Sequence, residues 1–402
     1  MQNITVACVQ PRMTVHATPD EFTAEARRFL RQAQAKAVQL TIFPELTGVL
    51  LAPPLISGFK LGFVKRQDRG KQPHSGFLAR SLGRLAGTTA SALGGGFRGS
   101  LGRLLRKKSD EYLALYQETL GQLAAEYSTA IVGGSLYILD PETGTVRNRA
   151  YVFDVDGSVL GYQDKLNLTP DEQELAAPGS ELTVFDTRYG RLGVLIGRDA
   201  LYPELARLLA LQGADLIAGI AAIPGAAYAH VVRNALALRA EENQVYTAAS
   251  FLIGPNHLGR EDRDDYYGRS ALLAPIALTP QADGVLVQAG TNRTEGFIAA
   301  TLDGAAMESL RQSGAFRPRS EMHLGGMGSL LAELYEEGLT IEEAASRYAP
   351  AIAPAPEEEE PAFAPVPVAE ELPDSIPEAL ALGEKPEPAA EEEPPAEENQ
   401  AT

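Results

Sequence analysis

The chain has 402 residues, of which 45 % are hydrophobic, and its formal net charge at pH 7 is −18. This length is sufficient for one large core or two smaller domains. No run approaches about 18 consecutive apolar residues, so the sequence predicts no transmembrane helix. The only cysteine, Cys8, excludes an internal disulfide, and the N-terminus lacks the basic segment and cleavage site of a signal peptide. We therefore expect a cytoplasmic protein.

The N-terminal part of the chain predicts two strands that flank a helix. The apolar run Ile4–Gln10 is the first strand, in which we expect Cys8 to be a buried small side chain rather than a nucleophile. A helix is predicted to begin after Thr18, which precedes a proline and a capping-box glutamate. The second strand, residues 40–43, ends just before Glu45 in the segment FPELTG. A glutamate at a strand end is usually solvated or ion-paired, so Glu45 alone indicates no function.

Residues 56–108 interrupt this pattern with a segment rich in glycine, leucine and arginine, which carries 12 basic residues and one aspartate. The first interpretation is a mobile surface insertion. The second is a basic amphipathic element that lies on an anionic membrane surface, so that the protein would be peripheral to a membrane. Nucleic-acid binding is a weaker third interpretation, because the segment has no recognised motif and few aromatic residues to stack on bases.

Regular patterns return at Ser109, which we expect to cap an amphipathic helix. Residues 130–132 predict a strand that runs into the sequence Gly-Gly-Ser. Residues 148–154 and 159–162 predict a hairpin around an Asp-Gly turn. Lys165 follows in the segment YQDKLNLTPDEQELAAPG, where a lone lysine would normally be solvated.

The stretch 191–207, with the sequence RLGVLIGRDALYPELAR, predicts a buried strand, a sharp turn and a helix. In α/β enzymes such a turn often holds a nucleophile, because it exposes a side chain next to a helix N-terminus. The residue at the tip of this turn is Gly197. It has no side chain and therefore cannot be a nucleophile.

The C-terminal part of the chain predicts a few more core elements and then a change in composition. Residues 297–302 predict the last core strand, and residues 306–349 predict an extension with one helix. Residues 350–402 are rich in proline, glutamate and alanine, and 355–402 carry 15 acidic residues and one lysine. Such a segment buries too little apolar surface to offset its conformational entropy, so we expect a disordered acidic tail.

Several of these segments resemble, in order along the chain, the motifs of the nitrilase or carbon-nitrogen hydrolase superfamily. The segment FPEL resembles the first motif, the lysine followed by L-T-P-x-E resembles the second, and GVLI-x-x-D followed by PELAR resembles the third. The resemblance covers residues 1–55 and 109–305. It implies a four-layer α-β-β-α sandwich of the nitrilase type, in which 1–305 form one α/β domain with 56–108 inserted.

The resemblance also implies roles for individual residues. Glu45 would be the general base, and Lys165 would stabilise the oxyanion of a tetrahedral intermediate. Glu172 would be the second, structural or assisting glutamate, with Glu174 as the alternative in this register. Gly197 occupies the position of the nucleophilic cysteine, so the side chain that attacks carbon is lost.

The implied partners follow from the same resemblance. The family uses only side chains, so no metal and no organic cofactor is implied, and its dimers imply a homodimer here. A small amide- or nitrile-like molecule is the implied ligand if the pocket is kept.

Three functions remain open at this point. The first is a carbon-nitrogen hydrolase family protein of the amide, nitrile and carbamoyl class that is impaired without its nucleophile and keeps a binding or scaffolding role. The second is an active hydrolase in which Glu45 activates water beside Lys165, with the carboxylate of Asp199 as another conceivable participant. The third is a membrane-surface adaptor that acts through residues 56–108.

Overall fold

The computed structural model describes residues 1–55, 96–258 and 264–321, together with the single residues 328, 332, 335 and 336. The chain divides into two compact units, Met1–Met322 and His323–Thr402. Most of the basic segment predicted as an insertion (56–95), most of the predicted C-terminal extension and the whole predicted acidic tail lie outside the described residues. Among the described residues, no helix combines the length and the apolar character needed to cross a membrane.

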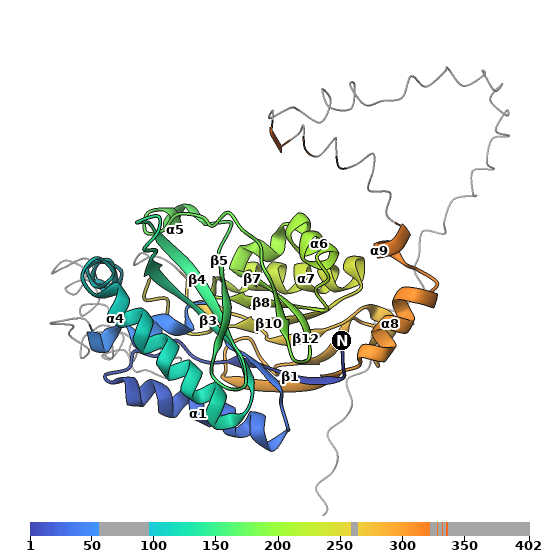
Figure 1. The fold of residues 1–402 in the computed structure, drawn as a ribbon, viewed down its shortest axis with the longest axis horizontal. Helices are drawn as coiled ribbons and strands as arrows, with labels where there is room; N and C mark the ends of the chain where they lie inside the picture. The colour runs from blue at the N-terminus through green and yellow to red at the C-terminus, as the bar shows by residue number, and fades with distance from the viewer. Residues whose placement is uncertain (56–95, 259–263, 322–327, 329–331, 333–334, 337–402) are drawn as a thin grey trace, which may run out of the picture. The chain divides into compact units, whose positions relative to one another are not determined.

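Two mixed sheets of six strands each form the centre of the first unit (Figure 1). Listed in spatial order, the first sheet consists of β14 (Gly296–Leu302), β1 (Ile4–Gln10), β2 (Leu40–Ile42), β3 (Ala130–Leu139), β4 (Val146–Phe153) and β5 (Val159–Asp164). The neighbours β1, β2 and β3 are parallel, and the outer pairs are antiparallel. The predicted hairpin at 148–162 is the β4–β5 pair.

The second sheet has a similar plan. Its strands, in spatial order, are β13 (Val285–Gln288), β12 (Ala271–Leu273), β10 (Tyr246–Phe251), β8 (Leu216–Ala221), β7 (Gly190–Ile196) and β6 (Val184–Thr187). The strands β7, β8 and β10 are parallel, and antiparallel strands flank them. A separate two-stranded sheet joins β9 (Ile223–Pro224) to β11 (Tyr266–Tyr267).

Alternate side chains of the two large sheets meet in one apolar layer. Val132 of the first sheet and Ile196 and Leu272 of the second belong to this single buried cluster. Cys8 lies in the same layer, fully buried as predicted, and burial raises the pKa of its thiol far above the ordinary value. It is therefore a core residue and not a replacement nucleophile.

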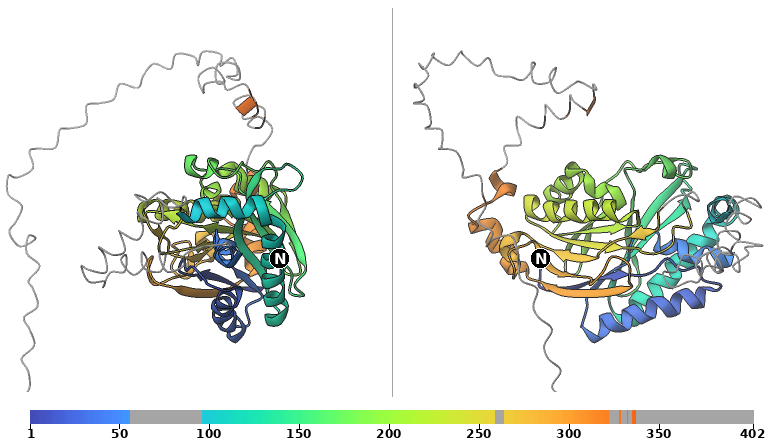
Figure 2. Two further views of the ribbon diagram at one scale, coloured as in Figure 1. Left: turned by 90° about the vertical axis from the view of Figure 1, so that its left-hand side faces the viewer. Right: turned by 180° about the vertical axis from the view of Figure 1, so that it is seen from behind.

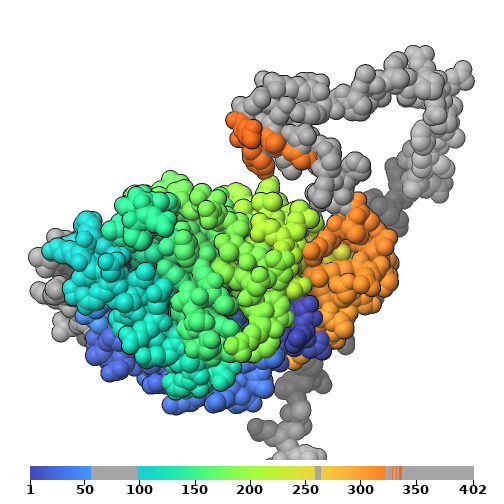
Figure 3. All heavy atoms as spheres, viewed as in Figure 1, coloured from blue at the N-terminus to red at the C-terminus, as the bar shows by residue number. Residues whose placement is uncertain are grey.

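Helices cover the outer face of each sheet, which gives the order α-β-β-α (Figures 1 and 2). The helices on the first sheet are α1 (Pro19–Ala35) and α4 (Gly96–Tyr127), and those on the second are α6 (Pro203–Leu211) and α7 (Ala226–Asn243). In the space-filling view, the blue and cyan segments that include α1 and α4 lie at the left, and the yellow-green segments that include α6 and α7 lie to the right of the centre, next to the orange C-terminal helices (Figure 3). The predicted fold class is thus confirmed.

Helix α4 changes the boundary predicted for the basic insertion. The helix begins at Gly96 rather than Ser109, and only Lys108, with φ −145° and ψ 30°, interrupts its helical backbone. Leu101, Leu104 and Leu105 are buried in the core cluster that covers the first sheet. Residues 96–108 therefore belong to the folded unit, and the three leucines of this stretch face its core. The sequence did not predict this part of the helix, because the stretch contains several glycines and glycine disfavours helix interiors.

Ser109 also has a different role from the one predicted. Its hydroxyl accepts a hydrogen bond from the Leu139 amide at 3.0 Å, so it joins α4 to the end of β3 instead of capping a helix.

Two short helices after β14 also belong to the first unit. They are α8 (Gly304–Ser313) and α9 (Pro318–Glu321). Tyr246 donates a hydrogen bond to the Asp303 carbonyl at 2.9 Å, and Arg319 donates one to the Ala210 carbonyl at 2.6 Å. These contacts attach α8 to the second sheet and α9 to α6, which covers that sheet. The compact unit therefore extends beyond residue 305, which was the predicted end of the domain.

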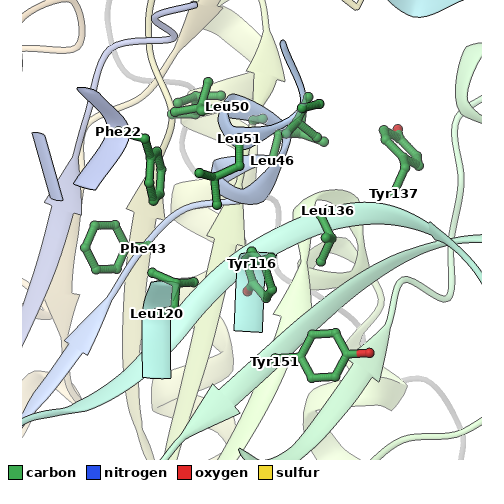
Figure 4. Packing of buried hydrophobic residues seen from close by; sticks show 14 of the residues in the cluster. Phe22, Phe43, Leu46, Leu50, Leu51, Tyr116, Leu120, Leu136, Tyr137 and Tyr151 are labelled. Carbon is green, nitrogen blue, oxygen red and sulfur yellow. The ribbon is translucent and has the colours of Figure 1, made fainter. Parts of the chain in front are cut away.

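The core against the first sheet also fixes the segment that carries Glu45. Short 3₁₀ helices, η1 (Thr47–Leu51) and η2 (Pro53–Leu55), follow this glutamate. Phe43 and Leu46, on either side of it, belong to one cluster with Tyr116 and Leu136 (Figure 4). Large apolar neighbours thus hold the backbone before and after the carboxylate.

Candidate functional site

Three charged side chains meet beneath the surface at one end of the two sheets. The Lys165 ammonium lies 2.7 Å from the Glu45 carboxylate and 2.5 Å from the Glu172 carboxylate. Glu45 follows β2 of the first sheet, Lys165 follows β5, and Glu172 lies in α5 (Pro170–Gln173). The side chains of Lys165 and Glu45 are 3 % and 1 % exposed, so this cluster is nearly isolated from water. The structure thus brings together the three charged residues that the sequence motifs singled out.

Two further groups hold the Glu45 carboxylate. The Ala222 amide, which follows β8 of the second sheet, donates a hydrogen bond to Oε2 at 2.9 Å. The Asn148 side-chain amide, from β4, donates one to Oε1 at 3.0 Å. No sequence motif pointed to Asn148. It lies between two arginines in the first half of β4, where polar residues are usually exposed, yet it is 99 % buried.

The Gly-Gly-Ser sequence in β3 positions the backbone beside Glu45. The Ser135 hydroxyl accepts a hydrogen bond from the Leu46 amide at 3.0 Å, and Leu46 has a φ of +65°. Gly134 has a φ of +71°, and a side chain there would collide with the Pro44 carbonyl. Only glycine permits this close approach, so the glycine and the serine together fix the turn that aims Glu45 at Lys165.

A capping box fixes Glu172. The Thr169 hydroxyl accepts a hydrogen bond from the Glu172 amide, and the Glu172 carboxylate accepts one from the Thr169 amide at 2.8 Å. The other carboxylate oxygen of Glu172 is thereby left for Lys165. Glu174, the alternative in the sequence register, instead pairs with Arg98 at 3.4 Å, with half of its side chain exposed.

The two carboxylates of the cluster differ in electrostatics. Burial raises the pKa of Glu45, with Lys165 opposing and Glu172 reinforcing the shift. For Glu172, burial is outweighed by Lys165 and the Thr169 hydrogen bonds, so its pKa is lowered. Burial also disfavours the Lys165 ammonium, but the two carboxylates outweigh it and raise the pKa of the lysine. Glu45 is therefore the member most ready to accept a proton, beside a lysine that stays charged.

Gly197 lies directly beside this cluster, at the end of β7. It begins a 3₁₀ helix, η3 (Gly197–Leu201), with a φ of +58°. A Cβ atom built on Gly197 would lie 2.8 Å from Glu45 Oε2 and 2.9 Å from Lys165 Nζ. A side chain at this position would thus touch both the base and the ammonium, which is the geometry that a nucleophile requires. In this chain no side chain is present there.

Asp199 ties the Gly197 turn to the loop that carries Lys165. Its buried carboxylate accepts hydrogen bonds from the Asn167 amide at 2.7 Å, the Leu166 amide at 3.1 Å and the Ile196 amide at 3.4 Å. Burial raises the pKa of Asp199, while Lys165 and these hydrogen bonds oppose the shift. Asp199 is therefore engaged in holding two loops together rather than in facing a ligand.

A cavity of about 110 Å³ opens above the charged cluster. Its wall contains polar groups that sequence analysis did not select, among them Tyr137, Arg198 and Tyr266, as well as Arg98 at the start of α4. Its apolar wall consists of Leu46, Leu175, Ala222, Ile223, Pro224 and Leu258. No local sequence pattern singled out Arg98 or Tyr266 as a cavity residue.

This arrangement has the chemistry to bind a small polar molecule and polarise it. An ammonium carries three protons, and Lys165 uses two of them on Glu45 and Glu172. The remaining proton can be donated to a carbonyl oxygen in the cavity, where burial strengthens such an interaction. Glu45 can take a proton, but the position beside it provides no thiol, hydroxyl or amine to attack carbon.

The family model described as carbon-nitrogen hydrolase matches residues 5–312 of the chain. Among curated proteins, the probable hydrolase YhcX of Bacillus subtilis is 32 % identical over 52 % of this chain and 39 % of its own length. The omega-amidase NIT3 of Saccharomyces cerevisiae is 31 % identical over 48 % of this chain and 66 % of its own length. The matches thus span less than two thirds of both relatives.

Solved structures share the fold at lower identity. The crystal structure of Saccharomyces cerevisiae Nit3, a member of branch 10 of the nitrilase superfamily, has a TM-score of 0.54 and 22 % identity. It is matched over 80 % of this chain and 97 % of its own. The carbon-nitrogen hydrolase of Helicobacter pylori has a TM-score of 0.59 and 18 % identity, over 82 % of this chain and 98 % of its own. At such identities the likeness shows the fold alone.

Proposed function

Because this chain belongs to the carbon-nitrogen hydrolase family, we propose that it binds a small amide above Glu45, Lys165 and Glu172 but lacks the covalent chemistry of a thiol. The observation that carries this proposal is the combination of an intact charged cluster with Gly197 at a position where a side chain would touch both Glu45 and Lys165. The names of two relatives, the omega-amidases of yeast and cattle, support an amide as the ligand class.

In this proposal, each charged group has a task in binding. The ammonium of Lys165 donates its third proton to the amide oxygen, and Glu172 keeps that ammonium in place. When the Glu45 carboxylate is ionised, it accepts a hydrogen bond from the N–H group of the amide. Loss of a covalent nucleophile lowers the rate of hydrolysis by several orders of magnitude. We therefore expect the protein to bind the amide without hydrolysing it at a useful rate.

The second function left open by the sequence is direct attack by water. The raised pKa of Glu45 suits a base that deprotonates water beside Lys165. This mechanism predicts that the native protein hydrolyses the amide without a nucleophilic side chain. A measurement of hydrolysis therefore distinguishes it from a protein that only binds the amide.

Calorimetric titration with butyramide, combined with an assay for ammonia release, tests the proposal. We expect saturable binding to the native protein and an ammonia release no faster than that of the Glu45→Gln variant. Glu118→Gln, on an exposed face of α4, is the matched control and should bind like the native protein. Absence of saturation would refute amide binding, and native turnover that only Glu45→Gln abolishes would establish the water mechanism instead.

We further propose that the chain forms a homodimer through the outer face of α6 and α7. Tyr228, Val231 and Leu238 lie within about 80° of one another around α7, and they are 69 %, 50 % and 59 % exposed. Leu208 and Leu211 of α6 are also about half exposed. Large apolar side chains gathered on one face are typical of a protein interface.

Sedimentation velocity tests the dimer. Leu238→Glu is expected to shift the protein towards monomer, because a charge would be buried without a partner in the interface. Val159→Glu, at an exposed position of β5, adds the same charge elsewhere and should leave the dimer intact. A native protein that sediments as a monomer at all accessible concentrations contradicts the proposal.

A further inference from the structure

A buried ion network at the β4–β5 hairpin is separate from the groups that line the cavity. Its centre is Arg149 of β4. The guanidinium donates to both carboxylate oxygens of Asp164 in β5, from Nε at 2.6 Å and from Nη2 at 2.9 Å. Nη2 also donates to the Asp140 carboxylate at 2.7 Å. The three side chains are at most 13 % exposed, so the network is largely shielded from water.

The network joins three neighbouring strands at one point. Asp140 begins the turn between β3 and β4, and its carboxylate also accepts hydrogen bonds from the Glu142 and Thr143 amides of that turn. Burial would raise the pKa of Asp140, but these bonds and Arg149 together outweigh it and lower the pKa, so this carboxylate stays charged. Asp164 lies in β5, which among the described strands is hydrogen-bonded on one side only. Arg149 therefore ties an edge strand to β4 and to the turn before it.

The same ion pair lies next to two residues of the charged cluster. Arg149 and Asp164 are directly opposite each other in the ladder between β4 and β5. The adjacent residues are Asn148 and Lys165, and the lysine amide donates to the asparagine carbonyl at 2.8 Å. Successive side chains of a strand point to opposite faces, so the ion pair occupies one face while Asn148 and Lys165 project from the other. Both of these side chains donate to Oε1 of Glu45, at 3.0 Å and 2.7 Å.

We infer that Arg149 is a positioning residue, which fixes the register of β4 and β5 and thereby aims Asn148 and Lys165 at Glu45. A slip of one residue between the strands would turn the lysine to the wrong face. Buried ion networks often add little stability compared with apolar residues of the same size, and fixing a register is their best-attested use. The ring of Tyr162 lies 3.6 Å from the guanidinium carbon and stacks on it, which holds Arg149 in this orientation. This role does not depend on the proposed amide binding.

The thiol of a Gly197→Cys variant can report on the alignment of Lys165. A Cβ at residue 197 would lie 2.9 Å from Lys165 Nζ, and a nearby ammonium increases the fraction of reactive thiolate. The rate of alkylation by iodoacetamide measures that fraction. The other thiol, Cys8, is fully buried, so the reagent reports on residue 197.

The network is removed from the Gly197→Cys protein by combining Arg149→Met, Asp140→Asn and Asp164→Asn. These three substitutions together leave no unpaired charge in the network, so we expect the urea midpoint to stay close to that of Gly197→Cys alone. Alkylation at pH 7 should nevertheless become at least about fivefold slower, and the pH of half-maximal rate should rise, because the ammonium is no longer held beside the thiol. A purely structural role of the network would leave the alkylation rate unchanged once stability is retained.

Two further variants in the Gly197→Cys protein complete the test. Arg149→Lys keeps a cation but cannot form the paired hydrogen bonds to Asp164, so it should also slow alkylation, and it decides the question if the triple combination does not fold. Arg188→Met, the control, removes an exposed arginine that pairs with Asp154 and should leave the rate unchanged. Alkylation within about twofold of the Gly197→Cys rate after loss of the network would overturn the role of Arg149. Because the assay contains no amide, this result is independent of what the cavity binds.

Discussion

The Gly197→Cys variant is expected to hydrolyse small primary amides at least about 10²-fold faster than the native protein, because a covalent nucleophile contributes several orders of magnitude to such reactions. The Cβ of residue 197 would lie 2.8 Å from Glu45 Oε2 and 2.9 Å from Lys165 Nζ, so a thiol there starts next to its base and its oxyanion donor. The positive φ of Gly197 and these close contacts require the neighbours to shift, so we expect only part of the full rate. Ammonia release from butyramide measures the gain.

The matched control for this experiment is Gly197→Ala. It introduces the same Cβ without a thiol, so it should show no gain in turnover and a loss of about 1–3 kcal/mol in the free energy of unfolding. The new thiol can be labelled selectively, because the only other thiol, Cys8, is fully buried. A folded Gly197→Cys protein that binds amide but hydrolyses it no faster than Gly197→Ala would show that the cavity does not aim a carbonyl at residue 197.

Replacing Lys165 with methionine is expected to lower the free energy of unfolding by about 3–5 kcal/mol, because it leaves two buried carboxylates without their cation. Both lose the contacts at 2.7 Å and 2.5 Å that now compensate for their burial. Urea unfolding followed by circular dichroism measures the change. Lys108→Met removes a lysine of an exposed pair with Glu111 and should cost at most about 1 kcal/mol.

The pH dependence of the Lys165→Met variant provides a second check. Without the ammonium, burial and mutual repulsion raise the pKa of both Glu45 and Glu172 above the unfolded value of about 4.3. The folded state then binds more protons than the unfolded state, so its stability rises as the pH falls. The loss caused by the substitution should therefore be smaller at pH 5 than at pH 8. A loss that is equal at both pH values would show that the carboxylates are not its cause.

In the native protein the two carboxylates act in opposite directions. The lowered pKa of Glu172 contributes stability that is present above its unfolded pKa and is lost as the pH falls through its folded pKa. The raised pKa of Glu45 contributes stability that is gained as the pH falls through its folded value. The native protein should thus show a weaker pH dependence than the variant over the same range.

The sequence was informative where function depends on neighbours along the chain. Glu45, Lys165 and Gly197 each sit in a local pattern of strand, turn and small residues, and the structure brings these patterns together at one end of the sheets. The α-β-β-α fold could also be predicted, because the resemblance to the nitrilase superfamily implies it and the alternation of predicted strands and helices agrees with it. Asn148 could not be assigned to Glu45, because the two are 103 residues apart and only the packing of β4 brings them into contact.

Other parts of the site depend on features that no local pattern contains. The glycines of residues 96–108 hid the start of α4, and with it the placement of Arg98 on the cavity wall.

The carboxylate of Asp199 has a consequence for how this site can change over evolution. It holds the backbone of the lysine loop and of the turn at residue 197, and none of these hydrogen bonds involves a side chain at 197. The hydrogen bonds that align the lysine loop with this turn are therefore independent of the side chain at residue 197. A lineage can lose its nucleophile by substitution at this single position and still inherit the aligned base, cation and cavity.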